Sequence, residues 1–336
     1  MARGGGLEGW GEVMSDRYSR QVVLPEVGEA GQARLAAASV AVVGAGGLGC
    51  AVLEYLTAAG VGALVIVDHD VVEESNLHRQ PLYRMSDCGQ PKVAAARAAL
   101  GALNPAVRIE ARAERLTPAN APGLAARAGV VVDAADSFAA TYVLSDACRR
   151  AGKPLVSASV LGLAGYVGAF CGGAPSYRAV FPELPRQAGS CAESGVLGTA
   201  VGVIGTLQAH LTLALLLGLE PTVLGRLISV DFRTLHVGGF SFLGAAEPAA
   251  ALPFIAPEEV TSSDLVIDLR GLAEAPVSPF ASARRLDVEA LEQGAPPLPS
   301  AARIVLCCRT GVRAWRAARA LEARGHRNLA LIALGG

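Results

Sequence analysis

The chain has 336 residues, 52% of them hydrophobic and 18% charged, a length that suits about two domains. Lys and Arg number 29 against 30 for Asp and Glu, so the formal net charge is −1. This near balance argues against a nucleic-acid-binding or polybasic membrane-binding protein. Only Lys92 and Lys153 are lysines, so arginine is the general basic residue of this chain.

The seven cysteines are odd in number and show no spacing typical of a disulfide framework. The first residues contain no apolar core of the signal-peptide kind, so reduced thiols and a cytoplasmic location are expected. The apolar run 195–219 is long enough to cross a bilayer. Gln208 and His210 lie in its middle, however, and no cationic flank would orient it. A buried core helix is therefore predicted, with no membrane partner.

Predicted strands and helices alternate along the chain. Residues 39–70 are expected to form a strand, a glycine turn, a helix and a second strand. A further helix begins at Pro91, strands follow near 108–111 and at 130–136, and 145–160 gives another helix and strand. Such alternation is typical of a doubly wound, Rossmann-like α/β fold with a mostly parallel sheet.

Composition also suggests a domain boundary. The stretch 241–262 is small-residue-rich, proline-containing and aperiodic, and is predicted to be a linker. The first domain is then expected at 15–240, and a second, smaller α/β domain at 263–336.

The glycine turn of the first domain has the pattern of a nucleotide-binding loop. Gly44, Gly46 and Gly49, with Gly47 between them, fit G-x-G-x-x-G after a strand and before a helix. These glycines permit the turn, the approach of backbone N–H groups to phosphate, and close helix–strand packing. Asp68 ends the next strand, where a carboxylate can accept a hydrogen bond from a ribose hydroxyl.

The residues after this acid favour a triphosphate over a dinucleotide. Asn76, Arg79 and Gln80 follow it, and Lys92 comes directly after Pro91. Proline suits the first turn of a helix, so Lys92 lies at the positive end of the helix dipole, which is unfavourable unless an anion binds there. A triphosphate that reacts needs such a cation, because charge develops on the α-phosphate and the leaving pyrophosphate.

Two further residues have alternative interpretations. Asp136 ends an apolar strand at the ligand-facing edge of the predicted sheet, where it could hold Mg²⁺ against phosphate or cap the following helix. Arg20 is either a further phosphate-binding cation or a solvated surface residue.

Six motifs occur in the order found in a known enzyme family: R-Y-x-R-Q at 17–21, G-x-G-G-L-G at 44–49, D-x-D at 68–70, S-N-L-x-R-Q at 75–80, G-Q-P-K at 89–92 and D-x-x-D at 133–136. Through them, the stretch from Ser15 to Gly239 resembles the adenylating enzymes of the ubiquitin-activating superfamily. Within that superfamily it is most similar to the activators of molybdopterin synthase and of thiamine-pathway sulfur carriers.

This resemblance implies ATP and Mg²⁺ as cofactors and a homodimer as the assembly. Asp68 would hold the ribose, and Arg79 and Lys92 the phosphates. Asp136 would hold Mg²⁺, and Arg20 would reach the site of the other subunit. The full set of implied nucleotide-binding residues is Gly44, Gly46, Gly47, Gly49, Asp68, Asp70, Asn76, Arg79, Gln80, Lys92 and Asp136.

The chain also departs from the family pattern. Two C-x-x-C pairs usually hold zinc, but residues 176–179 read Ser-Tyr-Arg-Ala and no second pair appears. Zinc needs four such ligands, so no zinc site is predicted, and Cys171 is expected to be a core thiol. Ser137 and Thr141 replace an amide and an arginine near the nucleotide, which would weaken binding of ATP or of the carrier.

Two cysteines are candidate reactive thiols. Cys191 matches the crossover-loop cysteine of the resembled branch, although it could simply be a small filler residue. Cys308 ends a predicted strand before a loop whose N–H groups and following helix favour thiolate. Residues 263–336 resemble a rhodanese-like sulfurtransferase domain, which we expect to be clipped at its C-terminus. In such a domain Cys308 would carry a persulfide, and Arg313 would add positive charge. Cys307 and Arg313 also fit the C-x5-R loop of cysteine phosphatases, but the glycine between them favours Cys308.

The sequence therefore predicts an adenylyltransferase with a sulfurtransferase domain. Its substrate would be a ubiquitin-like sulfur-carrier protein ending in Gly-Gly, with a cysteine desulfurase or thiosulfate as sulfur donor and no nucleic-acid partner. The pathway, whether molybdopterin, thiamine, tRNA or a secondary metabolite, stays open. The alternatives are a scaffold that has lost catalysis, an NAD-dependent oxidoreductase using the same glycine turn, and an enzyme that adenylates an RNA base.

Overall fold

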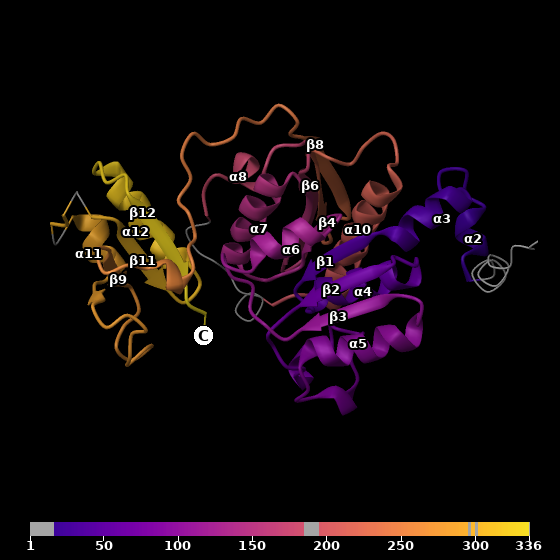
Figure 1. Cartoon of the computed structure of the whole chain (residues 1–336), viewed down its shortest axis with the longest axis horizontal. Helices are drawn as coiled ribbons and strands as arrows, with labels where there is room; N and C mark the ends of the chain where they lie inside the picture. The colour runs from indigo at the N-terminus through magenta and orange to yellow at the C-terminus, as the bar shows by residue number, and fades with distance from the viewer. Residues whose placement is uncertain (1–16, 185–194, 295–296, 300–301, 336) are drawn as a thin grey trace, which may run out of the picture.

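The computed structural model describes residues 17–184, 195–294, 297–299 and 302–335. They form two α/β units, each built on its own sheet, which lie side by side (Figure 1). The larger unit has an eight-stranded sheet and the smaller a four-stranded sheet. The predicted α/β class with a second, smaller α/β unit is confirmed.

The large sheet has the order β3-β2-β1-β4-β5-β6-β7-β8. Its first five strands in this order are parallel, and the last three pair antiparallel. Strands β1 to β3 are added toward one edge of the sheet, and β4 and β5 toward the other, so the strand order reverses between β1 and β4. Doubly wound sheets bind their ligands at this point. The strands are β1 (Ser39–Val43), β2 (Ala63–Val67), β3 (Arg108–Arg112), β4 (Val130–Asp133), β5 (Pro154–Leu161), β6 (Ala164–Cys171), β7 (Arg226–Asp231) and β8 (His236–Ser241).

Helices cover both faces of the parallel part, because its strands are apolar on both sides. Val40 and Val42 of β1 pack toward one helical layer, whereas Ala41 and Val43 pack toward the other. The first layer contains α3 (Gly28–Ala37), α4 (Gly47–Ala58) and α5 (Lys92–Leu103), and the second contains α6 (Ala121–Arg127), α7 (Phe138–Ala151) and α8 (Tyr177–Val180).

The long apolar helix α10 (Gly198–Leu217) has the length and composition of a membrane span. In this fold it packs against α4, β5 and β6. Its Gln208 is fully buried and donates hydrogen bonds to the carbonyl oxygens of Asp133, at 2.6 Å, and Val156, at 3.1 Å. Gln208, in the middle of the apolar run, thus connects α10 to strands β4 and β5, as expected for a core helix.

The smaller unit is an all-parallel sheet of order β10-β9-β11-β12. Its apolar central strand ends at the predicted persulfide cysteine, and a helix follows directly. The elements are β9 (Leu265–Asp268), β10 (Arg284–Arg285), α11 (Val288–Gln293), β11 (Ile304–Cys308), α12 (Val312–Ala323) and β12 (Leu329–Ala333).

The end of the predicted linker belongs to this second sheet. Ile255 donates its N–H to the carbonyl of Leu331, and Leu331 donates to the carbonyl of Pro253, both at 2.9 Å. Phe254 between them is buried in the main apolar cluster. The domain boundary at 241–262 remains a prediction, but part of the stretch is held by pairing to β12 rather than running free.

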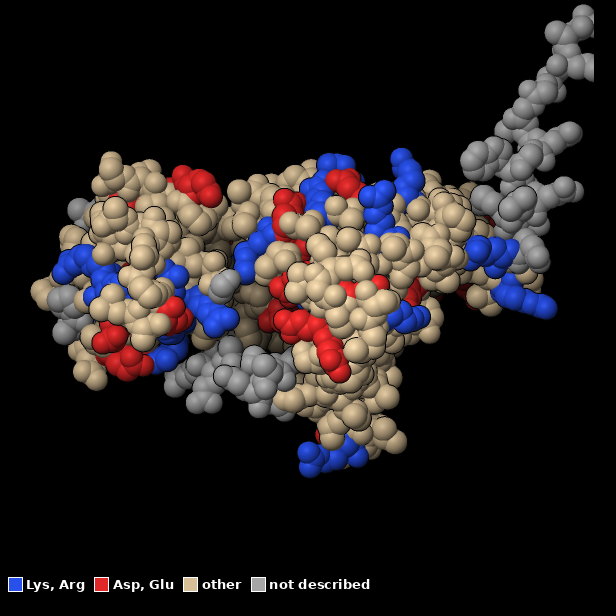
Figure 2. All heavy atoms as spheres, turned by 90° about the horizontal axis from the view of Figure 1, so that it is seen from below, with Lys and Arg blue, Asp and Glu red and all other residues tan. Residues whose placement is uncertain are grey.

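The two units share an interface of rings and charges. The ring centroids of Tyr142 on α7 and Trp315 on α12 are 5.4 Å apart. Trp315 donates its indole N–H to Glu183 at 3.3 Å, and Arg319 forms an ion pair with the same carboxylate. The face shown in Figure 2 mixes acidic and basic side chains without a broad area of one sign.

Candidate functional site

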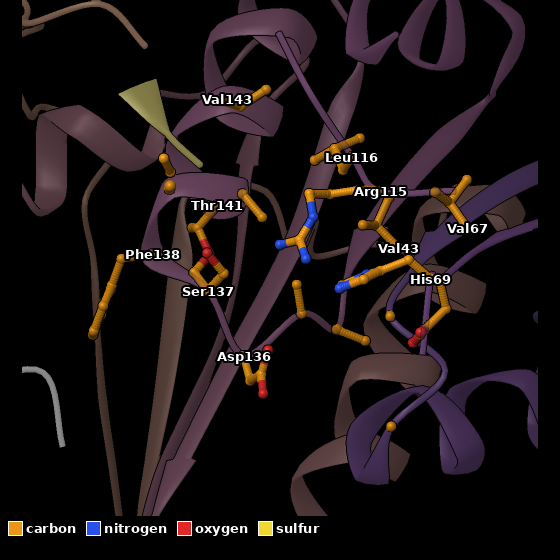
Figure 3. A pocket seen from close by; sticks show the side chains of 18 of the residues that line it. Val43, Val67, His69, Arg115, Leu116, Asp136, Ser137, Phe138, Thr141 and Val143 are labelled. Carbon is orange, nitrogen blue, oxygen red and sulfur yellow. The ribbon is translucent and has the colours of Figure 1, made fainter. Parts of the chain in front are cut away.

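A cavity of about 620 Å³ opens at the carboxyl ends of the parallel strands. Figure 3 shows part of its lining. It brings together ten of the predicted nucleotide-binding residues, although they come from separate segments of the chain. These are Gly44, Gly46, Gly47, Asp68, Asp70, Asn76, Arg79, Gln80, Lys92 and Asp136.

The glycines of the turn either leave no room for a Cβ or face the cavity. At Gly44, with φ of +96°, a Cβ would lie 2.5 Å from the carbonyl oxygen of Ala134, and at Gly47 it would lie 2.6 Å from Val201. At Gly46 a Cβ would meet only the Gln80 side chain, at 3.8 Å, because this residue faces the cavity. Gly49 does not line the cavity. A Cβ there would lie 2.0 Å from the Gly44 carbonyl oxygen, so its role is packing rather than ligand contact.

Asp68 is fixed beside this turn at the end of β2. One carboxylate oxygen accepts a hydrogen bond from the backbone N–H of Ala45, at 2.7 Å, and the other from the N–H of Asp70, at 2.8 Å. The carboxylate therefore lies against the loop that would approach phosphate, where a sugar hydroxyl could donate to it.

Lys92 is the first residue of α5, and its side chain is only 7% exposed. Its Nζ lies 3.0 Å from a carboxylate oxygen of Asp70. Burial alone would raise the pKa of Asp70, but the hydrogen bond and charge of Lys92, with the charges of His69 and Arg115, hold it below its usual value. The sequence suggested an external anion as the partner of Lys92. In this structure Asp70 supplies the negative charge.

Gln80 and Arg79 follow a short 3-10 turn, Glu74–Asn76. Gln80 is 3% exposed, and its Oε1 has no hydrogen-bond partner among the described residues, although the side chain lines the cavity. A buried oxygen without a partner is costly unless a ligand donates to it. Arg79 donates to the carbonyl oxygen of Ser75 at 3.2 Å.

Asp136 lies three residues beyond β4 and is exposed toward the cavity. The residue at the N-cap position of α7 is Ser137, and no side chain caps that helix. This disfavours the helix-cap alternative for Asp136. Its neighbour in the D-x-x-D motif, Asp133, is fully buried and accepts a hydrogen bond from Ser157 at 2.8 Å. Burial raises the pKa of Asp133 to about 6.

The second candidate centre is the loop after β11. The sulfur of Cys308 accepts hydrogen bonds from the backbone N–H groups of Gly311, at 3.1 Å, and Ala314, at 3.4 Å. Gly311 has φ of +87°, so the loop turns back over the sulfur and α12 points its N-terminus at it. Such convergent N–H groups stabilise negative charge on sulfur.

The neighbouring groups distinguish the two cysteines of this strand. Burial, and then the charge of Asp268, raise the pKa of Cys307 to about 12. The pKa of Arg313 is raised, chiefly by its hydrogen bond with Glu274 and further by the adjacent Cys308. The cation therefore lies beside Cys308, which agrees with the rhodanese-like register. Cys308 itself is fully buried.

Residues 18–250 match the model of the ThiF family, which accounts for more than half of the chain. The chain belongs to the ThiF family. This confirms the predicted family, and the NAD-dependent oxidoreductase alternative is not favoured.

Several relatives support this assignment. Bovine adenylyltransferase and sulfurtransferase MOCS3 (Bos taurus) is 53% identical over 64% of this chain and 48% of its own length. The sulfur carrier protein adenylyltransferase of Thermus thermophilus is 46% identical over 68% of this chain and 89% of its own. The chain thus spans about half the length of the bovine relative.

One relative spans both units. The probable adenylyltransferase/sulfurtransferase MoeZ of Mycobacterium tuberculosis is 35% identical over 92% of this chain and 88% of its own, which supports the predicted fusion. Among solved structures, Escherichia coli MccB has a TM-score of 0.62 at 20% identity, covering 72% of this ThiF-family chain and 75% of its own. A likeness at this identity supports the fold alone.

Two further predicted site residues, Arg20 and Arg313, do not line this cavity, as is also true of Gly49 and Cys308. Arg20 is exposed on the short helix α2 (Ser19–Val22), which fits a residue acting in another subunit as well as a surface residue. Arg313 lies in the second unit. Cys191 lies outside the described residues.

The stretch 176–179, where no zinc ligands are predicted, forms hydrogen bonds and ion pairs with other segments of the chain. Ser176 donates from its N–H and its hydroxyl to the two carboxylate oxygens of Glu247, both at 2.7 Å. Arg178 is 4% exposed, donates to both carboxylate oxygens of Asp146, and donates to the carbonyl oxygen of Leu252. These contacts tie α8 to the chain that leads into the second unit.

We therefore expect Glu247→Gln to lower the free energy of unfolding by about 1 kcal/mol, because the hydrogen bonds with Ser176 would lose the negative charge that strengthens them. Urea denaturation of the full chain measures the change. Glu26→Gln, at an exposed position of the same chain, is the matched control. Equal stability of the two variants would show that this pairing contributes nothing.

The absence of zinc remains a prediction and has its own test. We expect elemental analysis of the purified chain to find far less than one zinc per molecule, and EDTA to leave its thermal midpoint unchanged. One zinc per chain, with a lower midpoint in EDTA, would contradict the prediction.

Proposed function

We propose that this chain uses ATP to adenylate the C-terminal glycine of a small ubiquitin-like carrier protein and then transfers sulfur to it. The observation that carries the proposal is the position of Lys92. This buried cation begins α5 in the same cavity as the glycine turn and Asp68. A hydride-transfer site has no need of such a group, whereas an attacked α-phosphate does.

In the adenylation step, a carboxylate oxygen of the carrier's terminal glycine attacks the α-phosphorus. The bond from phosphorus to the oxygen that bridges to the β-phosphate breaks, and pyrophosphate leaves with its electron pair. Asp68 holds the ribose, and the N–H groups of the glycine turn, Arg79 and Lys92 stabilise the charge on the phosphate oxygens.

Asp136 is the residue we propose to hold Mg²⁺ with ATP. Its carboxylate is exposed in the cavity, and the structure gives it no hydrogen bond or ion pair with any described residue, which suits a hard cation that prefers oxygen ligands. When bound, Mg²⁺ would neutralise charge on the phosphate oxygens.

In the sulfur-transfer step, the terminal sulfur of a persulfide on Cys308 attacks the acyl carbon, and AMP leaves. The product is an acyl group joined to Cys308 through two sulfur atoms. A thiolate must then attack the Cys308 sulfur, so that a new disulfide forms and the thiocarboxylate leaves. We propose Cys191 as this thiol, and a cysteine desulfurase or thiosulfate as the source of the persulfide.

The test uses the full chain and the small Gly-Gly-ending protein encoded beside it or co-purified with it. We expect carrier-dependent exchange of pyrophosphate into ATP, and mass spectrometry should detect an adenylate and then a thiocarboxylate on the carrier. Absence of both exchange and adenylate with that partner would refute the proposal.

A non-catalytic scaffold is the second candidate. Thr141 replaces an arginine of the family pattern, and its hydroxyl donates to the Ser137 carbonyl at 3.3 Å instead of pointing a charge at the nucleotide. Calorimetry with MgATP tests this candidate, because the absence of detectable binding would favour the scaffold.

We also propose a cytoplasmic homodimer in which Arg20 acts in the partner's site. If so, Arg20→Ala and Lys92→Ala variants that are each inactive should regain activity on mixing, because some mixed dimers contain one intact site. No recovery after exchange of subunits would show that Arg20 does not act across an interface.

A further inference from the structure

The loop between β3 and α6 places Arg115 at the nucleotide cavity. Figure 3 shows its guanidinium pointing into the space between His69 on one side and Ser137 and Thr141 on the other. The loop backbone is fixed, because Asn120 donates its side-chain N–H to the Arg115 carbonyl at 2.9 Å. This hydrogen bond fixes the backbone from which the Arg115 side chain extends into the cavity.

The charge of Arg115 acts on Asp70 through space, lowering the pKa of that carboxyl group, but the guanidinium is not bound to it. Lys92 pairs with Asp70, and Arg79 donates to a backbone carbonyl, but the structure gives the Arg115 guanidinium no hydrogen bond or ion pair with any described residue. An arginine held in a cavity without an acceptor retains all five of its N–H donors for a ligand.

A glycine of the second unit lies beside the Arg115 side chain. Gly335 lines the same cavity, and a Cβ there would lie 2.5 Å from the guanidinium carbon of Arg115. Gly335 is held in place by its N–H, which donates to the Arg309 carbonyl at 2.8 Å. A Cβ at position 335 would therefore require the guanidinium of Arg115 to shift from this position.

The opposite wall lacks a positive charge at a position where the resembled family has an arginine. Here that position is Thr141, and Ser137 replaces the amide. Both line the cavity, and neither brings a cation to it. Arg115 comes from another element but reaches the same space.

We propose that Arg115 is an anion-binding residue of this site, which binds a phosphate oxygen of the nucleotide or a carboxylate oxygen of the carrier. It would thereby replace the positive charge missing at Thr141. The proposal rests on the proposed adenylation. The planar guanidinium suits both anions, because it can donate two parallel hydrogen bonds to either. One source is the α-phosphate of the nucleotide, and the other is the carboxylate of the carrier's terminal glycine.

The experiment compares Arg115→Ala with Arg108→Ala, an exposed position on the adjoining strand β3 that does not line the cavity. Calorimetry measures binding of MgATP, AMP and adenosine to the full chain, and exchange kinetics measure the KM for the carrier. If Arg115 binds phosphate, its removal should weaken binding of AMP and ATP about tenfold, the effect of losing about 1.4 kcal/mol. If it binds carboxylate, nucleotide affinity should stay the same and the carrier KM should rise about tenfold.

In both cases adenosine binding should be unchanged, because adenosine carries no anion, and Arg115→Lys should restore part of the loss. The proposal is overturned if Arg115→Ala matches Arg108→Ala in all these measurements, or if adenosine binding is lost equally. Wild-type chain that binds AMP but performs no exchange would refute the proposed function, and the AMP comparison would still decide the role of Arg115. Wild-type chain that binds no nucleotide would overturn both.

Discussion

Replacing Lys92 by alanine is expected to abolish carrier-dependent ATP–pyrophosphate exchange. Lys92 is the buried cation at the start of α5, and removing one group that stabilises a charged transition state typically costs on the order of 3–4 kcal/mol, or about 10²–10³ in rate. The fold should survive, because the partner left behind, Asp70, is half exposed to water.

Lys153→Ala is the matched control, since Lys153 is the other lysine of the chain and does not line the cavity. Its exchange rate should equal that of the wild type. Lys92→Arg tests whether charge alone suffices, because arginine retains the charge but needs more room. Normal exchange by Lys92→Ala would remove Lys92 from the mechanism.

The second large effect is expected at the other centre. Cys308→Ala should leave adenylation intact and remove sulfur transfer from thiosulfate or a persulfide donor. The reason is that the sulfur of Cys308 accepts hydrogen bonds from the backbone N–H groups of Gly311 and Ala314, which stabilise negative charge on it. Mass spectrometry of the carrier should then detect the adenylate without the thiocarboxylate. Loss of both products would show that the two units do not divide the chemistry in this way.

Cys307→Ala is the neighbouring control. Cys307 is also buried on β11, but burial raises its pKa to about 12, so it is a poor source of thiolate. Sulfur transfer should persist in this variant. Transfer that required Cys307 and not Cys308 would instead favour the phosphatase-like register of the same loop.

The parts of the site that could be predicted are those that local sequence determines. The glycine turn with Asp68 depends on a strand, a tight loop and a helix in close succession, so its geometry follows from spacing. Lys92 could be placed because Pro91 marks where a helix begins. The parallel sheet brings the ends of β1, β2 and β4 to one edge, and this collects the separate motifs in one cavity.

The parts that sequence reasoning missed depend on contacts between distant segments. Asp70 was predicted as a nucleotide residue, but nothing in the spacing shows that it pairs with Lys92, 22 positions later. Arg115 lies in a loop with no motif, and its guanidinium lies beside Gly335 of the other unit. The only available signal was indirect, namely an arginine missing at Thr141 and an unexplained arginine elsewhere.

Contacts between the two units also have a consequence for the timing of turnover. Gly311 of the Cys308 loop lies so close to Phe254 that a Cβ would come within 2.8 Å of its ring, and the same loop faces Ala139 at the start of α7. Because Cys308 is fully covered, a sulfur donor can reach its sulfur only after this loop moves away from Phe254 and Ala139. We therefore expect the loading rate to reach a plateau as donor concentration rises, at a value set by the opening of the protein and shared by chemically different donors.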